Sequence, residues 1–123
     1  MPTTYRGLDV WQRSLMLVAA VYDLTKRLPP DERYGLVSQL RRAAVSIPCN
    51  IAEGYGRATR GEYLNHLSVA RGSLNEVETL CTVCRTLGLL KPEDLGGVED
   101  HLDRLRRMLG RLRMSLTTRR TRP

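Results

Sequence analysis

The sequence SIPCNIAEGYGR, residues 46–57, decides the fold because it places a proline inside a helical pattern and closes that pattern with glycines. Apolar residues recur at helical spacing on both sides of Pro48 and stay in one phase. Proline removes a backbone donor and clashes with the carbonyl group four residues earlier. We therefore predict one helix kinked between Ala44 and Pro48, although two helices broken at Ser46 would also satisfy the pattern. The two closing glycines predict a left-handed helix end.

Four segments of the chain carry an amphipathic helical period, at about residues 8–28, 31–54, 60–87 and from Pro92 or Leu95 to Leu116. Only a few residues separate one segment from the next. Four such helices with short connections predict an all-α, antiparallel up-down-up-down four-helix bundle. Leu, Ala, Arg and Glu dominate the composition, which favours helices, and no hairpin signal supports strands.

Local signals mark several helix ends. Thr59 and Glu62 have the spacing of a capping box, which predicts the start of the third helix. Gly88 is placed to cap the end of that helix. Gly96 and Gly97 weaken the start of the fourth helix, so we expect its order to begin only at Val98.

Length and composition predict a single domain over residues 1–116, followed by a basic, disordered tail at residues 117–123. No run of about 18 apolar residues exists, so we expect no membrane-spanning segment. The N-terminal residues lack the pattern of a signal peptide, which predicts a cytoplasmic protein with reduced thiols.

The first amphipathic segment carries two apolar stripes side by side. One contains Leu8, Trp11, Leu15, Val18 and Tyr22 at alternating spacings of three and four. A helix that is apolar on much of its circumference cannot bury itself with one core contact. We therefore predict that the second stripe forms a contact with another copy of the chain; it consists of Val10, Leu17, Val21 and Leu24.

Polar residues on the second and third helices predict an inter-helix network, the polar seam. Its predicted members are Gln39, Arg42, Ser46, Asn50, Glu53, Arg71 and Glu76, and the third helix also offers Ser73 and Glu78. Antiparallel pairing of the two helices places Arg42 beside Glu76, and we expect an ion pair there. Such groups specify register or oligomeric state more than they add stability. An ordinary solvated face is the alternative.

The cysteines raise a choice between packing and metal binding. Cys81 and Cys84 fall late in a helix on its core stripe, where cysteine packs as a small apolar residue. The alternative is a zinc site with His101 and a neighbouring carboxylate. We expect core packing, no metal and no cofactor. No nucleophile, base and acid fall in a recognisable catalytic arrangement, so we also expect no enzymatic activity.

The net charge of +7 is concentrated at the end of the chain, because five arginines and no acid follow Gly110. A local basic patch is typical of contact with nucleic acid or another polyanion, and a solvated basic end is the alternative. Few aromatic residues accompany the arginines, so any contact is led by phosphates. The candidate contact residues are Arg41, Arg42, Arg57, Arg60, Arg111 and Arg113.

Most of the chain, from Leu8 to about Leu116, resembles the four-helix bundle family of 23S rRNA intervening-sequence proteins, which includes the accessory variability proteins of diversity-generating retroelements. The matching pieces are Leu8 with Trp11, Tyr22, Leu28-Pro29 with Glu32, Gly35-Leu36 with Gln39, the run from Arg41 to Pro48, the run from Asn50 to Gly54, Arg57, and Ala70 to Ser73 with Glu76 and Glu78. Cys49 departs from the family, in which a small residue such as serine or alanine is usual there.

The resemblance implies a four-helix bundle, a ring-like homopentamer and no catalysis. It also implies, for the retroelement members, binding of a reverse transcriptase and of nucleic acid. We therefore predict a non-enzymatic oligomeric scaffold that binds RNA, DNA or a nucleoprotein partner. A pure protein-interaction scaffold is the alternative.

Overall fold

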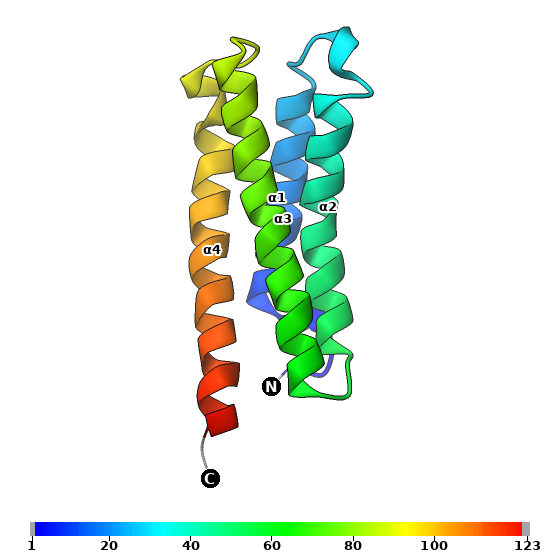
Figure 1. Cartoon of the computed structure of the whole chain (residues 1–123), viewed down its shortest axis with the longest axis vertical. Helices are drawn as coiled ribbons and strands as arrows, with labels where there is room; N and C mark the ends of the chain where they lie inside the picture. Colours follow the sequence, from blue (N-terminus) through cyan, green and yellow to red (C-terminus); the bar gives the residue numbers. More distant parts are fainter. Residues whose placement is uncertain (1, 122–123) are drawn as a thin grey trace.

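The computed structural model describes the backbone of residues 2–121 and the side chains of residues 2–117. Four long helices make up the fold, and no strand occurs within that range. They are α1 (Asp9–Thr25), α2 (Leu36–Tyr55), α3 (Arg60–Thr86) and α4 (Pro92–Thr121), with short 3₁₀ turns η1 (Tyr5–Gly7) and η2 (Pro30–Glu32). Figure 1 shows the helices side by side as a bundle. The all-α, four-helix prediction is therefore confirmed.

Each helix packs against two others. α2 lies between α1 and α3, and α4 contacts both α3 and α1. The α1–α2 and α3–α4 connections lie at one end of the bundle, and the α2–α3 turn lies at the other (Figure 1). The buried apolar residues of all four helices form one core, centred on side chains such as Leu40, Ile47, Leu74 and Leu105.

Pro48 is buried within α2, which continues without a break from Leu36 to Tyr55. The prediction of one helix is therefore confirmed, and the alternative of a break at Ser46 is wrong. A proline at this place leaves the carbonyl group of Ala44 without its usual backbone donor, and the kink itself stays a prediction.

The glycines at the end of α2 do not act as predicted. Gly56 keeps a right-handed conformation with φ of −83°. Gly54 instead permits close packing, because a Cβ atom there would lie 2.7 Å from Cβ of His66. In the described backbone only Gly88, with φ of +73°, adopts the left-handed conformation, at the end of α3. Glycine is therefore needed here so that α2 and α3 can pack closely, and not because the turn between them requires a left-handed residue.

Caps fix the helix boundaries. The backbone N–H of Glu62 donates to the Thr59 hydroxyl at 3.1 Å, as the capping box predicts, and the hydroxyl in turn donates to the Glu62 carboxylate. Glu32 accepts from the backbone N–H of Leu36 at 3.2 Å, so α2 begins later than its acidic residues suggest. The backbone N–H of Lys91, and then the Arg27 guanidinium, hold the pKa of Asp94 below its ordinary value.

Helix α4 differs from the prediction at both ends. It begins at Pro92 and includes Gly96 and Gly97, so the expectation of order only from Val98 is wrong. Leu95 is buried there, and this packing outweighs the low helix propensity of the two glycines. The helix also extends past Leu116 to Thr121. Residues 122–123 and the side chains from residue 118 lie outside the described part, so the predicted disorder of the tail stays a prediction.

Candidate functional site

The apolar stripe assigned to a subunit contact lies inside the molecule. Leu17 and Val21 are 0% exposed, and Val10 and Leu24 are also buried in the core of the single chain. The prediction that these four residues form an oligomer interface is therefore wrong. The other stripe of α1 remains at the surface, where Leu15 is 42% exposed. α2 and α4 cover the stripe that contains Leu17, whereas the stripe that contains Leu15 is only partly covered, with Trp11 and Val18 half-buried.

An open groove follows this partly covered stripe between α1 and α2. Its apolar part has a volume of about 340 Å³ and is lined by Tyr5, Trp11, Leu15, Val18, Val45, Pro48, Cys49 and Ala52. The ring of Tyr5 packs edge-on against Trp11, at 5.2 Å between centroids. Val45 also lines a second, larger hollow, so the two form one continuous surface, which we call the α1–α2 groove.

The second hollow forms the basic end of the α1–α2 groove. Two of the predicted contact residues, Arg41 and Arg42, line it together with Tyr22, Ser38, Val45 and Ser46. The guanidinium of Arg41 lies over the Tyr22 ring at 4.3 Å, a cation–π contact. Its Nε donates to the Thr25 hydroxyl at 2.9 Å, and Thr25 is buried. These contacts hold Arg41 in one orientation, and its terminal nitrogens remain available for an anion.

A polar network joins α2 to α3 at Ser46 and Asn50. The Ser46 and Ser73 hydroxyl groups are 2.9 Å apart, and the Asn50 amide donates to both the carbonyl and the hydroxyl oxygen of Ser46. The Asn50 carbonyl oxygen lies 3.1 Å from Nδ1 of His66. Sequence reasoning offered Ser73 among the polar residues of the third helix but missed His66, although both recur at helical spacing beside the apolar stripe of α3. The seam thus consists of short, half-buried side chains that form hydrogen bonds with one another.

The members of the predicted polar seam with longer side chains take no part in this network. No ion pair joins Arg42 to Glu76 among the described side chains, so that prediction is wrong. Gln39, Arg71 and Glu76 are exposed. Glu53 pairs at the surface with Arg57 at 2.7 Å instead. Long charged side chains reach water at the rim of a helix pair, whereas serine and asparagine fit between the helices.

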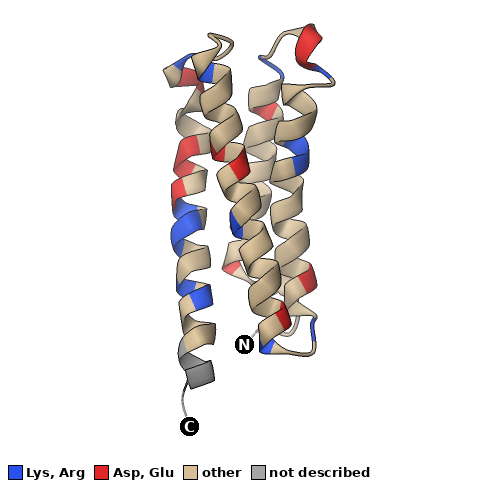
Figure 2. Ribbon diagram, in the orientation of Figure 1, with Lys and Arg blue, Asp and Glu red and all other residues tan. Residues whose placement is uncertain are grey.

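The remaining candidate arginines lie near one end of the bundle. Arg57 lies in the α2–α3 turn, Arg60 begins α3, and Arg111 and Arg113 lie in the C-terminal half of α4. Figures 1 and 2 show the turn and that half of α4 toward the same end, with the acidic residues of α4 in its other half. Arg113 donates to Ser68 at 3.3 Å, and its buried Nε has no partner within residues 2–117.

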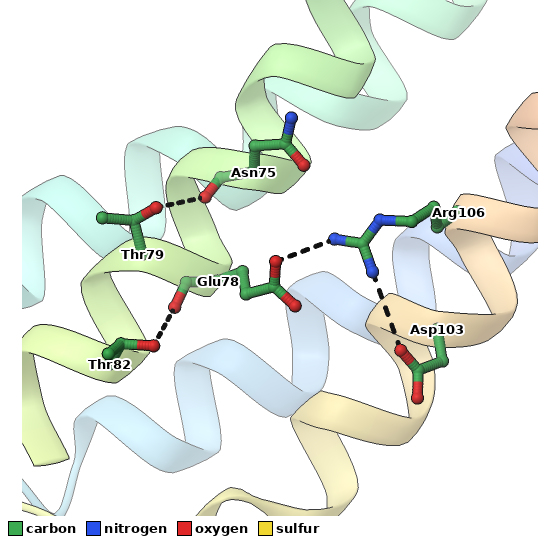
Figure 3. Close-up of polar contacts among 6 residues, drawn as sticks. All are labelled: Asn75, Glu78, Thr79, Thr82, Asp103 and Arg106. Atoms are coloured by element: carbon green, nitrogen blue, oxygen red, sulfur yellow. Dashed lines mark hydrogen bonds and ion pairs between the residues drawn. The ribbon is translucent and has the colours of Figure 1, made fainter.

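Other arginines of α4 are neutralised locally. Arg106 donates to Glu78 of α3 at 3.1 Å and lies 3.6 Å from Asp103, as Figure 3 shows. Arg104 pairs with Asp100 at 3.2 Å. In the same view, threonines of α3 donate to carbonyl groups one turn earlier, as Thr82 does to Glu78. This part of the α3–α4 face is therefore occupied by its own polar contacts.

The two cysteines of α3 are packing residues. Cys81 and Cys84 are buried, and burial, followed by the charge of the neighbouring thiol, raises the pKa of Cys81 to about 12. Zinc requires the thiolate form, which burial opposes. Within the described side chains no three His, Cys, Asp or Glu residues, Cys81, Cys84 and His101 included, are placed to hold a metal ion.

The described structure thus belongs to the class of all-α, four-helix proteins, with a helix-lined surface groove and a basic end. A profile of the family described as 23S rRNA-intervening sequence protein matches residues 6–111, so the chain belongs to that family. No curated protein matches the chain with significant similarity. No helix within residues 2–121 is long and apolar enough to cross a bilayer.

Proposed function

We propose that this protein is a cytoplasmic, non-enzymatic, oligomeric scaffold that binds RNA, DNA or a nucleoprotein partner through its basic surfaces. The observation that carries the proposal is the charge of α4 and the residues beyond it. After Asp103 the sequence contains eight arginines and no acid. A run of arginines without acids is the electrostatic footprint of phosphate binding.

The described contacts sharpen which arginines would take part. Of the α4 arginines up to residue 117, Arg104 and Arg106 form ion pairs, whereas Arg107 and Arg111 are exposed and form none. At the same end Arg60 begins α3 and forms no ion pair in the described structure, whereas Arg57 in the turn pairs with Glu53. Phosphate contacts by such arginines fix nucleic acid by its backbone and carry no sequence information.

Salt-dependent binding to duplex and single-stranded RNA and DNA tests the proposal. Each phosphate contact contributes about 0.9 to the slope of log affinity against log salt for duplex DNA. Replacing both Arg107 and Arg111 by alanine should weaken binding and reduce this slope. Arg104→Ala is the matched control, because Asp100 already neutralises that charge. Absence of binding at low salt would contradict the nucleic-acid role.

The finer architecture is also part of this proposal. The alternating ends of the connections in Figure 1 support an antiparallel up-down-up-down path. The resemblance to the wider family, including the retroelement accessory proteins, supports a ring-like homopentamer. The partly covered stripe of α1 supports self-association, because monomers rarely leave a continuous apolar groove exposed.

A pure protein-interaction scaffold is the second candidate, and the α1–α2 groove favours it. Its apolar lining suits an amphipathic helix better than a phosphate backbone. Self-association without nucleic-acid binding at low salt would support this second candidate over the first.

A further inference from the structure

Two surfaces of the molecule match each other in chemistry but do not meet within one chain. One is the α1–α2 groove, in which Arg42 lies seven residues before Cys49 on α2. The other is an exposed stripe on α3, formed by Val69, Glu76 and Val83, which we call the α3 stripe. Its valines are 46% and 36% exposed, although α3 buries its opposite face in the core.

The spacings of the two surfaces agree. Glu76 lies seven residues from each valine of the α3 stripe, which is about 10 Å along a helix. The same length of α2 separates Arg42 from Cys49, with Val45 between them. A helix laid in the α1–α2 groove with its carboxylate at the basic end therefore places a valine beside the apolar lining.

Charge complementarity identifies the occupant. Neither Arg41 nor Arg42 forms an ion pair with any described side chain, and Glu76 forms none either. Arg41 is already oriented by Tyr22 and Thr25, so ordering it again costs little on binding. An exposed carboxylate between two exposed valines fits this end of the groove.

We propose that the α3 stripe of a second copy of this chain docks in the α1–α2 groove and that its Glu76 pairs with Arg42 and Arg41. This inference rests on the self-association included in the proposed function. The contact joins two different surfaces, so each copy offers both and the assembly continues from copy to copy. A contact of this type closes into a ring when the rotation permits, and otherwise forms a filament.

Charge exchange tests the contact directly. Arg42→Glu and Glu76→Arg should each raise the concentration at which half of the chains are assembled by about tenfold or more, because like charges then face each other. The chain that carries both substitutions should assemble near the wild-type concentration. Light scattering and sedimentation give the masses, and thermal unfolding shows that each variant is folded.

Mixing the two single variants provides a stronger test. In a mixed assembly most grooves then meet an α3 stripe of opposite charge, although a five-membered ring keeps at least one contact between two copies of the same variant. The mixture should therefore assemble at a lower concentration than either variant alone. Arg85→Glu and Glu99→Arg are matched controls, because both residues are exposed and form no ion pair in the described structure. Both controls should assemble like the wild type.

The results separate this inference from the proposed function. If folded Arg42→Glu and Glu76→Arg chains assemble like the wild type, the docking contact is wrong and self-association stands. Failure of the doubly exchanged, folded chain to assemble would also contradict it. A monomeric wild type would overturn both the contact and the scaffold's self-association. Glu76→Arg adds a positive charge, so its assembly defect cannot arise from weaker nucleic-acid binding.

Discussion

The two apolar stripes of α1 both follow helical spacing but lie in different environments. Leu17 and Val21 are fully buried among the other helices, whereas Leu15 and Tyr22 line the α1–α2 groove and remain exposed. The difference shows that an apolar pattern identifies a helix face that avoids water, but it does not reveal which surface covers that face. Folding buries one stripe, whereas the other is available for contact with a second molecule.

The largest effect on stability is expected when a leucine is replaced by alanine in the buried stripe, and the same substitution in the exposed stripe serves as the comparison. Leu17→Ala should lower the free energy of unfolding by about 2–5 kcal/mol, because it removes a fully buried side chain and leaves a cavity. Leu15→Ala should lower it by less than about 1 kcal/mol, since that side chain is already partly in water. Urea denaturation measures both. Equal losses would show that the stripes are not distinct.

The polar seam extends the comparison to α2. Asn50→Ala should cost about 1–3 kcal/mol, because it leaves polar atoms of Ser46 and His66 unsatisfied between the helices. Gln39→Ala is the matched control, an exposed amide that should change stability by less than about 0.5 kcal/mol. A loss at Gln39 as large as that at Asn50 would contradict the assignment of the seam.

The reactivity of the cysteine thiols distinguishes the exposed groove from the buried core. Cys49 lines the groove and is exposed, so iodoacetamide at pH 8 should modify it, whereas folded Cys81 and Cys84 should react only on unfolding. Self-association through the groove should slow the reaction of Cys49. Mass spectrometry after a time course checks this order. Faster modification of Cys81 than of Cys49 would contradict it.

The pH dependence of stability follows from the same burial. The pKa of Cys81 is about 12 in the folded chain against an ordinary value of 9.0, so the folded state retains a proton that the unfolded state releases. Stability should therefore decrease as the pH rises from 9 toward 12. Cys81→Val should reduce that slope, and Tyr63, whose pKa burial also raises to about 12, accounts for part of the remainder.

The smallest effect is expected at the α2–α3 turn. Arg57→Ala removes an exposed ion pair with Glu53 and should change the free energy of unfolding by less than about 0.5 kcal/mol. Thermal unfolding at low and high salt measures it. A larger loss would mean that this arginine stabilises the fold instead of remaining available to a partner.

Much of the helical architecture follows from local physics that the sequence contains. The period of three and four residues, the capping box at Thr59 and the positive φ of Gly88 each depend on residues within one or two turns. Pro48 also stays in a single helix because the apolar residues on both sides remain in phase and pack together.

Tertiary packing decided what local patterns leave open. It selected the stripe of α1 that enters the core, because that choice depends on how α2 and α4 lie against α1. It gave Gly54 a role in helix proximity, and it replaced the expected Arg42–Glu76 pair by contacts of Ser46 and Asn50 with Ser73 and His66. The sequence by itself thus determined which faces avoid water, and only the packed bundle decided which partner each face meets.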